Sequence, residues 1–273
     1  MGRSGDILKT PLNVAKATEP YSHSRLSVFE QCPRRYRLRY VDKVEVEEAV
    51  GIEAFTGTLV HDSLEHLYAM ARDGQVVGWE QLTARLRNRW DELFDDSVFI
   101  VRKDATPHDH LLRAQSMLMA YYRSNYPFDE GDTVGLEHEL RFNISGSREH
   151  EMIGYIDRLT CLADGVYEIH DYKTGKRMPS PAVIGKDRQL ALYEIGVRRS
   201  FPDVKEVHLI WHYLAFGQQM RSRRTPEQLE RLEADTSALI EEIEGCVRYP
   251  RQEGPLCRWC EYAGMCQEHD APL

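Results

Sequence analysis

Two carboxylates and a lysine stand at short spacing in the stretch from Ile153 to Lys176. Asp157 lies in the segment IGYIDRLTC, Asp171 and Lys173 lie in VYEIHDYK, and Ala163-Asp164-Gly165 separates the two segments. Two alternating segments joined by three residues, with Gly in the left-handed position, are typical of a β-hairpin. The pattern therefore predicts a hairpin that carries two acids and a base.

The expected register places these three groups on one face of the hairpin. A three-residue loop pairs Leu162 with Val166, Leu159 with Ile169, Asp157 with Asp171, and Tyr155 with Lys173. Because side chains alternate along a strand, both carboxylates and the lysine then share a face. Opposed residues have Cβ atoms roughly 4.5–5.5 Å apart, so one hard cation can bridge the two carboxylates. The alternative is a surface hairpin with scattered charge.

Such a group of residues is suited to hydrolysis of a phosphodiester. A carboxylate-bound divalent cation stabilises charge at phosphorus and makes water nucleophilic near neutral pH. A lysine on the same face can contact that water or the developing oxyanion. Asp157, Asp171 and Lys173 are therefore the candidate catalytic residues.

Length and composition predict a globular protein without a membrane span. The chain has 273 residues, 42% of them hydrophobic, and no apolar run approaches about 18 residues. We expect a flexible N-terminal lead-in over residues 1–21, without a signal peptide, followed by one domain over residues 22–273, and a cytoplasmic location. The net charge of −9 argues against general coating of nucleic acid but allows a local basic groove.

The C-terminal cysteines are spaced as metal ligands. Cys257-x2-Cys260-x5-Cys266 lies in a loop at about residues 250–269. A tetrahedral site needs a fourth ligand, for which Cys32, Cys161, Cys246 and His269 are candidates. Cys32, beside Pro33 at the edge of a helix, is the best of them. Four thiolates suit either zinc or an iron–sulfur cluster, and the spacing does not decide between them.

Aromatic and basic residues alternate in the N-terminal segment SHSRLSVFEQCPRRYRLRYV, residues 22–41. Ser24 is the expected N-cap of a helix, and Pro33 is expected to open a second one. Arg34 and Arg35, interleaved with tyrosines, suit a nucleic-acid backbone and its bases. The alternative is a packing helix with solvated arginines.

The remaining elements are expected to alternate in type. Apolar spacing predicts a helix over 57–72 with His61 in its first turn, and a strand over 134–144 that turns Glu137 or Glu139 toward the metal. It also predicts helices over 79–95 and 108–126, which form a helical insert at about 75–130. After the hairpin, it predicts a helix over 181–200, strands over 204–216 and 218–224, and a helix over 226–247.

Six motifs in order resemble the RecB-like nucleases of the PD-(D/E)XK superfamily. They are SRLSVFEQCPRRYRLRYV, GTLVH, GYIDRL, HDYKTGK, QLALY and the CxxC-x5-C tail, and together they span nearly all of residues 24–269. The cysteines are similar to those of the iron–sulfur branch, which includes AddB-type recombination nucleases and CRISPR-adaptation nucleases. The resemblance implies an α/β, restriction-endonuclease-like fold, with a mixed central sheet flanked by helices, the helical insert and the C-terminal cysteine-cluster loop.

The resemblance also assigns roles to individual residues. The ligands of Mg²⁺ or Mn²⁺ would be His61, Asp157, Asp171 and the backbone carbonyl of Tyr172. The ligands of a [4Fe–4S] cluster, with zinc as the alternative, would be Cys32, Cys257, Cys260 and Cys266. Lys173 would position or activate the water, and the expected DNA contacts are Gln189, Tyr193, Arg34 and Arg35. The second acidic position is Asp171 instead of glutamate, and Ile156 stands where the superfamily's name implies proline.

These observations predict a metal-dependent DNA nuclease, an exonuclease, in DNA repair or recombination. DNA is the expected partner, with a helicase or another recombination or CRISPR-adaptation protein beside it, since no GxxxxGK[ST] motif is present. The alternatives are a subunit that cuts only within such a complex, a non-catalytic DNA-end-binding module, and a zinc-stapled protein without catalysis at the hairpin.

Overall fold

The computed structural model describes residues 19–46, 50–101, 104–146 and 148–266. The expected lead-in falls mostly outside the described residues, as does His269. Tyr21, the last residue of that range, is buried and forms a parallel bridge with Met152. No helix among the described residues has the length and apolarity needed to cross a bilayer.

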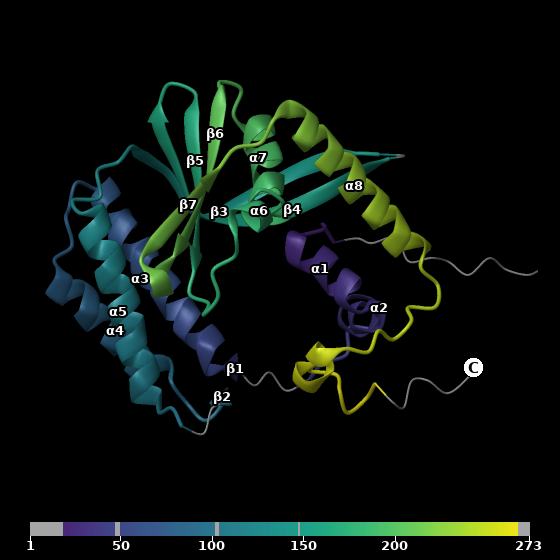
Figure 1. Cartoon of the computed structure of the whole chain (residues 1–273), viewed down its shortest axis with the longest axis horizontal. Coiled ribbons are helices and arrows are strands. Elements are labelled where there is room, and N and C mark those ends of the chain that lie inside the picture. The colour runs from purple at the N-terminus through teal and green to yellow at the C-terminus, as the bar shows by residue number, and fades with distance from the viewer. Residues whose placement is uncertain (1–18, 47–49, 102–103, 147, 267–273) are drawn as a thin grey trace, which may run out of the picture.

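A five-stranded mixed sheet lies at the centre of the molecule (Figure 1). Its order follows the chain, and every neighbouring pair is antiparallel except β5 and β6, which are parallel. The strands are β3 (Asp132–Ser145), β4 (Glu149–Ala163), β5 (Val166–Lys173), β6 (Glu206–Tyr213) and β7 (Gln218–Ser222). This arrangement confirms the mixed sheet expected from the sequence.

Helices cover both faces of this sheet (Figure 1). One group is α3 (Ile52–Arg72), α4 (Trp79–Leu93) and α5 (Pro107–Asn125). The other group is α1 (His23–Gln31), α7 (Arg188–Ser200) and α8 (Pro226–Gly245). The short elements are α2 (Pro33–Tyr36), η1 (Arg37–Val41), β1 (Val50–Gly51), β2 (Val98–Phe99), α6 (Pro181–Ile184), η2 (Leu214–Phe216) and η3 (Pro255–Trp259).

The sheet separates two hydrophobic clusters, and β5 contributes to both. Ile169 packs in the cluster with α1, α7 and α8, whereas Tyr172 packs in the cluster with α3, α4 and α5. Successive residues of a strand point to opposite faces, so β5 contributes side chains to both clusters. Asp171 and Lys173 lie on the same face as Ile169, at the C-terminal end of the strand, and Asp171 is itself buried.

The hairpin register differs from the expected one near the turn. Leu159 pairs with Ile169 as expected, but Ala163 pairs with Val166 after an irregularity, so the loop is Asp164-Gly165 alone. Gly165 has φ +79°, the left-handed conformation that the loop requires. The expected pair of Leu162 with Val166 was therefore wrong.

Several helix ends also differ from expectation. Helix α3 begins at Ile52, so His61 lies in its third turn instead of its first. The N-cap of α1 is Ser22, whose hydroxyl accepts from the Arg25 N–H, and not Ser24. The expected helix over 181–200 is two helices, because Asp187 caps a new start by accepting from the Leu190 N–H.

Candidate functional site

The site forms where β4 and β5 part. The pairing of the two strands ends at Arg158 and His170, one position before Asp157 and Asp171. There the Asp157 carboxylate accepts a hydrogen bond of 2.7 Å from the backbone N–H of Tyr172. The Asp157 carboxylate thus takes the place of a backbone carbonyl of β4 as the partner of this N–H. The bond fixes the carboxylate where the two strands separate, which we call the fork of the hairpin.

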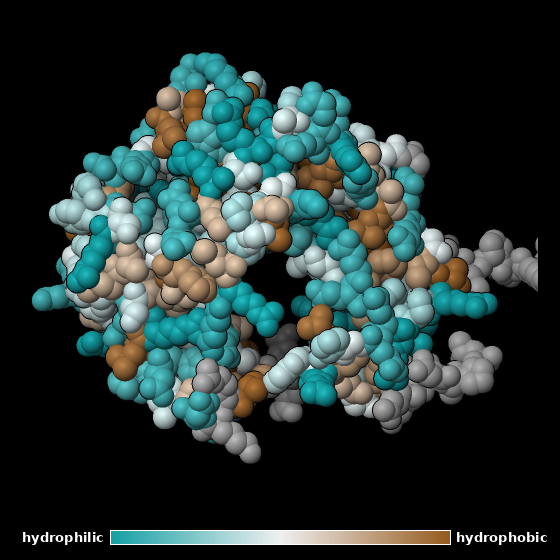
Figure 2. All heavy atoms as spheres, viewed as in Figure 1, coloured by the Kyte–Doolittle hydropathy of each residue, from teal (hydrophilic) through white to brown (hydrophobic). Residues whose placement is uncertain are grey.

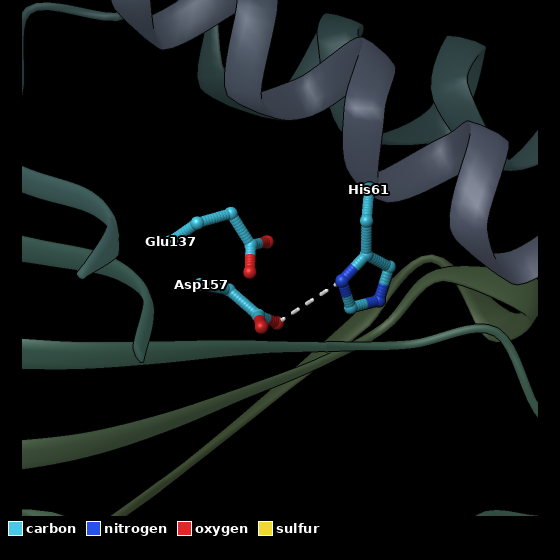
Figure 3. Close-up of side chains that lie close together, drawn as sticks. All are labelled: His61, Glu137 and Asp157. Carbon is cyan, nitrogen blue, oxygen red and sulfur yellow. Dashed lines mark ion pairs between the residues drawn. The ribbon is translucent and has the colours of Figure 1, made fainter. Parts of the chain in front are cut away.

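His61 and Glu137 meet Asp157 at this fork (Figure 3). His61 Nδ1 lies 3.5 Å from Asp157 Oδ2, and its Nε2 donates to the Tyr172 carbonyl at 2.7 Å. That second contact orients the ring and leaves the Nδ1 lone pair facing the carboxylates. Among the described residues, this is the one trio of His, Cys, Asp or Glu whose ligand atoms all lie within 4.8 Å.

Glu137 reaches the trio through a strained backbone. It has φ +41°, and it lies on β3 between the pairs Leu136–Arg158 and His138–Ile156, across from Asp157. A non-glycine residue in this conformation costs about 1–3 kcal/mol and occurs most often at functional sites. The expectation that Glu137 or Glu139 turns toward the site is confirmed for Glu137, whereas Glu139 pairs with Arg141 at 2.7 Å.

The trio is electrostatically suited to a cation. Burial, together with the charge of Asp171, raises the pKa of Asp157 to about 7. Burial and the nearby Asp157 likewise raise the pKa of Glu137. A divalent ion would stabilise the ionised carboxylates of Glu137 and Asp157, which otherwise repel each other. One histidine nitrogen with several carboxylate oxygens is a ligand set that Mg²⁺ or Mn²⁺ accepts.

Asp171 lies beside this trio but turns toward Lys173. The lysine Nζ lies 2.8 Å from Asp171 Oδ2 and 3.0 Å from Oδ1. Oδ2 is buried and accepts no well-formed hydrogen bond from the described residues, in spite of this ion pair. A buried carboxylate oxygen with remaining capacity is where a cation can bind. Burial raises the pKa of Asp171, although Lys173 opposes the rise.

Gln189 and Tyr193 hold the lysine from α7. Lys173 donates to Gln189 Oε1 at 3.1 Å, and Gln189 Nε2 donates to the Tyr193 hydroxyl at 3.3 Å. Tyr193 is only 9% exposed. The structure therefore brings both residues to the site as expected, with Tyr193 behind Gln189 in a supporting position.

Tyr193 also packs on the backbone of β4, which makes Gly154 irreplaceable. A Cβ at Gly154 would lie 2.3 Å from Tyr193 Cε1. We expect Gly154→Ala to destabilise the protein by about 1–3 kcal/mol, because a buried ring and the strand must move apart. Urea unfolding measures this effect. Gly245→Ala, where no atom lies within 4 Å of the new methyl group, should change stability by much less; equal losses would contradict the packing argument.

The raised pKa of Asp157 predicts an unusual dependence of stability on pH in the metal-free protein. The pKa of Asp157 is about 7 in the folded protein and near 3.8 in the unfolded chain. Its contribution to the stability of the fold is therefore complete below about pH 4 and is lost as the pH rises through 7. Asparagine keeps the bond to Tyr172 and does not ionise. In EDTA, the free energy of unfolding of Asp157→Asn relative to that of the wild-type protein should therefore increase by about 2–3 kcal/mol from pH 5 to pH 8.

Urea unfolding of both proteins at the two pH values checks this prediction. At pH 8, saturating Mn²⁺ should make the wild-type protein more stable than Asp157→Asn, because the ion binds the ionised native site and not the unfolded chain. An equal difference in the free energy of unfolding at both pH values would contradict the raised pKa of Asp157.

A second group of candidate ligands lines a cavity of about 510 Å³ between α1, α2 and the C-terminal segment. The lining includes all four expected cysteines, Cys32, Cys257, Cys260 and Cys266. The Gln252 N–H donates to Cys32 Sγ at 3.5 Å, and the Gly254 N–H donates to Cys257 Sγ at 3.4 Å. Cys161 and Cys246 lie elsewhere, in contact with the main core. The choice of Cys32 over these two is thus supported by its position.

Arg34 and Arg35 line this cysteine cavity and not the hairpin site. Arg35 pairs with Glu261 at 2.9 Å, and the Arg34 N–H donates to the Pro250 carbonyl at 3.2 Å. These contacts join α2 to the C-terminal segment. The expected role of Arg34 and Arg35 in binding DNA stays a prediction.

Comparisons with known proteins agree with this arrangement. The chain is 25% identical over 178 residues to an ATP-dependent helicase/deoxyribonuclease subunit of Clostridium tetani, a match covering 57% of this chain and 15% of that protein. It thus spans a small part of that relative's length. The fold is similar to the crystal structure of a candidate exonuclease from Eubacterium rectale, with a TM-score of 0.54, 13% identity, and coverage of 97% of this chain and 94% of that one. A family model described as PD-(D/E)XK nuclease superfamily matches residues 20–267. The chain therefore belongs to the PD-(D/E)XK nuclease superfamily.

Proposed function

We propose that the protein is a divalent-metal-dependent DNA exonuclease of DNA repair or recombination. The observation that carries this proposal is the convergence of His61, Glu137 and Asp157 at the fork of the hairpin that bears Asp171 and Lys173. A nuclease of this superfamily needs a cation next to a base or a cationic group; His61, Glu137 and Asp157 are candidate ligands for the cation, and Lys173 is the cationic group beside them. The superfamily membership supplies the reaction class, and the site supplies the residues.

The cation, Mg²⁺ or Mn²⁺, would be held by His61 Nδ1, Glu137, Asp157 and Asp171, with the Tyr172 carbonyl close by. When bound, it supplies charge stabilisation at phosphorus and acidifies a water molecule. Asp171 would then be shared between the cation and Lys173, and the Lys173 ammonium group would be free to contact the attacking water or a phosphate oxygen.

Lys173 is held as a cation for this task. Burial alone lowers its pKa, but Asp171 and then Asp157 outweigh burial, so the pKa is raised above its ordinary value. The group therefore stays charged at neutral pH. A charged lysine positions water and stabilises developing negative charge more readily than it removes a proton.

An opening between the two helical sides offers a route for a DNA strand. Figure 2 shows it through the face of the molecule, between the α3–α5 side and the α1–α2 side, with hydrophilic residues along part of its margin. A strand that enters by an end and passes such a site fits exonuclease action. The Clostridium tetani relative is named a helicase/deoxyribonuclease subunit, and a helicase or another recombination partner is part of the proposal for this chain.

We further propose a [4Fe–4S] cluster in the cysteine cavity. The four cysteines line one cavity, and their spacing resembles that of the iron–sulfur branch; one zinc ion is the alternative occupant. Four arginines line the same cavity, Arg34, Arg35, Arg251 and Arg258, of which Arg35 pairs with Glu261 and Arg251 with Glu253.

The test is degradation of end-labelled linear DNA by protein purified without oxygen. We expect cleavage with Mg²⁺ or Mn²⁺, none in EDTA, and products that shorten progressively from one end. Covalently closed circular DNA should resist cleavage. Cutting of closed circles would replace exonuclease with endonuclease action. Metal-independent cutting would overturn the proposal, and DNA binding without cutting would favour a partner-dependent subunit or a binding module.

A further inference from the structure

A basic pocket adjoins the hairpin site on the side of α3 and α5. Its volume is about 380 Å³, and its lining includes Glu53, His110, Arg113, Thr174, Lys176 and Arg177. None of the six belongs to the metal site or to the cysteine cavity. The pocket is therefore a separate feature of the surface, and its position and charge indicate which ligand it suits.

The walls of this basic pocket continue the elements that hold the metal site. Thr174 directly follows Lys173 in the chain. On α3, Gly57 lies about one turn before His61, and a Cβ at Gly57 would lie 3.0 Å from Thr174 Oγ1. A DNA strand whose scissile phosphate lies at Asp157 and Lys173 therefore has this pocket next along one direction of its backbone.

The charge of the pocket favours an anion. Lys176 pairs with Glu53 at 3.2 Å, so these two charges offset each other. Arg113 donates to the Thr174 carbonyl at 3.2 Å and meets no carboxylate among the described residues. Arg177 has no ion pair in the described part of the chain. Within the described part of the chain, the guanidinium groups of Arg113 and Arg177 thus have no carboxylate partner.

We propose that this pocket binds a backbone phosphate of the DNA strand next to the scissile phosphate. Guanidinium groups bind phosphate through two parallel hydrogen bonds, and the Thr174 hydroxyl is a further donor. Gly175 also lines the pocket, and nothing lies within 4 Å of where its Cβ would be. The inference rests on the proposed nuclease function and adds to it one site that orients the strand.

The test compares Arg113→Gln and Arg177→Gln with Arg123→Gln, an exposed arginine ten residues further along α5 and outside the pocket. Binding of a fluorescent single-stranded oligodeoxynucleotide is measured with Ca²⁺ in place of Mg²⁺, over a series of salt concentrations. Each pocket variant should weaken binding about five- to tenfold and lower the log–log salt slope by about 0.7. The control should stay within about twofold.

Cleavage of the same oligonucleotide in Mg²⁺ gives a second readout. A contact away from the reacting phosphate contributes equally to ground state and transition state, so KM should rise while kcat stays within about threefold. Thermal unfolding checks the fold, and Arg177→Gln, at an exposed position, decides the question if Arg113→Gln unfolds.

The outcomes separate this proposal from the nuclease proposal. If the wild-type protein cuts DNA and the pocket variants bind and cut as it does, the pocket proposal is overturned and the nuclease stands. An equal loss in Arg123→Gln would show general electrostatic attraction and would also overturn the pocket proposal. If the wild-type protein neither binds nor cuts DNA, the nuclease proposal fails and this inference fails with it.

Discussion

Replacing Lys173 with methionine is expected to slow metal-dependent DNA cleavage by about a hundred- to ten-thousandfold, with DNA binding changed by less than about fivefold. Methionine keeps most of the side-chain length but removes the charge that Asp171 and Gln189 hold in place at 3.0 and 3.1 Å. The lost interaction is one that strengthens as charge develops at phosphorus, so kcat should fall and KM should change little. Single-turnover cleavage of labelled linear DNA measures the effect.

The matched control is Lys205→Met, which removes an exposed lysine whose partner, Asp164, is also exposed. This variant should cut DNA at nearly the wild-type rate. Asp171→Asn should be as inactive as Lys173→Met but should also bind Mn²⁺ more weakly, because it removes a proposed ligand. Wild-type rates in Lys173→Met would show that the lysine has no part in catalysis. Loss of cooperative unfolding would mean that the variant reports on folding alone.

The sequence was sufficient for the elements that carry strong local signals. Alternation over residues 153–173 predicts two strands, and the glycine at 165 predicts the turn, because only local sterics are involved. Period-3.6 patterns likewise predict α4, α5 and α8 within a few residues. The motif order then predicts which strand end carries the acids. All of these features depend on residues close together in the chain.

The geometry of the site depends on contacts that no local pattern contains. Asp157 accepts from the Tyr172 N–H where the pairing of β4 with β5 ends, fifteen residues away along the chain. Glu137 reaches the site through φ +41° on a third strand, a conformation that its residue type disfavours. Sequence alternation could indicate Glu137 or Glu139 as a ligand but could not choose between them.

A buried polar group behind the site was missed entirely. Arg158, 2% exposed, lies with its guanidinium 3.9 Å from the centre of the Tyr68 ring and donates to His170 Nδ1 at 3.1 Å. His170 in turn contacts His212 Nε2 at 3.0 Å. These residues come from α3, β4, β5 and β6, and an arginine next to a catalytic aspartate appears in sequence as an ordinary surface charge. Only the three-dimensional arrangement shows that it is enclosed.

Replacing Cys32 with serine is expected to remove the proposed cluster and to detach the C-terminal segment from α2. Four cysteines from the two ends of the described chain line one cavity, so the metal would connect residues 225 positions apart, from Cys32 to Cys257. Binding energy of a structural metal site is folding energy, because the unfolded chain holds no preformed site. We expect a loss of more than about 3 kcal/mol in stability, together with loss of iron and of visible charge-transfer absorption.

Cys161→Ser is the matched control, since Cys161 lies at the end of β4 with its thiol donating to the Ala163 carbonyl at 3.2 Å, away from the cavity. Anaerobically purified protein should keep its iron in this variant and lose it in Cys32→Ser, and limited proteolysis should then cut near residues 250–260 in Cys32→Ser alone. Retention of full metal content by Cys32→Ser would remove Cys32 from the ligand set.

The contacts that remain without the metal explain why the effect on the C-terminal segment should be large. Arg35 with Glu261 at 2.9 Å is a partly exposed ion pair of small net value, whereas Tyr262 is buried and its hydroxyl donates to the Val44 carbonyl at 3.4 Å. Together with the Arg34 backbone N–H to the Pro250 carbonyl, these contacts are expected to hold the segment on α2 less firmly than four metal–thiolate bonds would. One zinc ion in place of iron would still connect the chain ends, so metal analysis of the wild-type protein distinguishes a cluster from a single ion. In either case the bound metal should decide whether the C-terminal segment stays on α2.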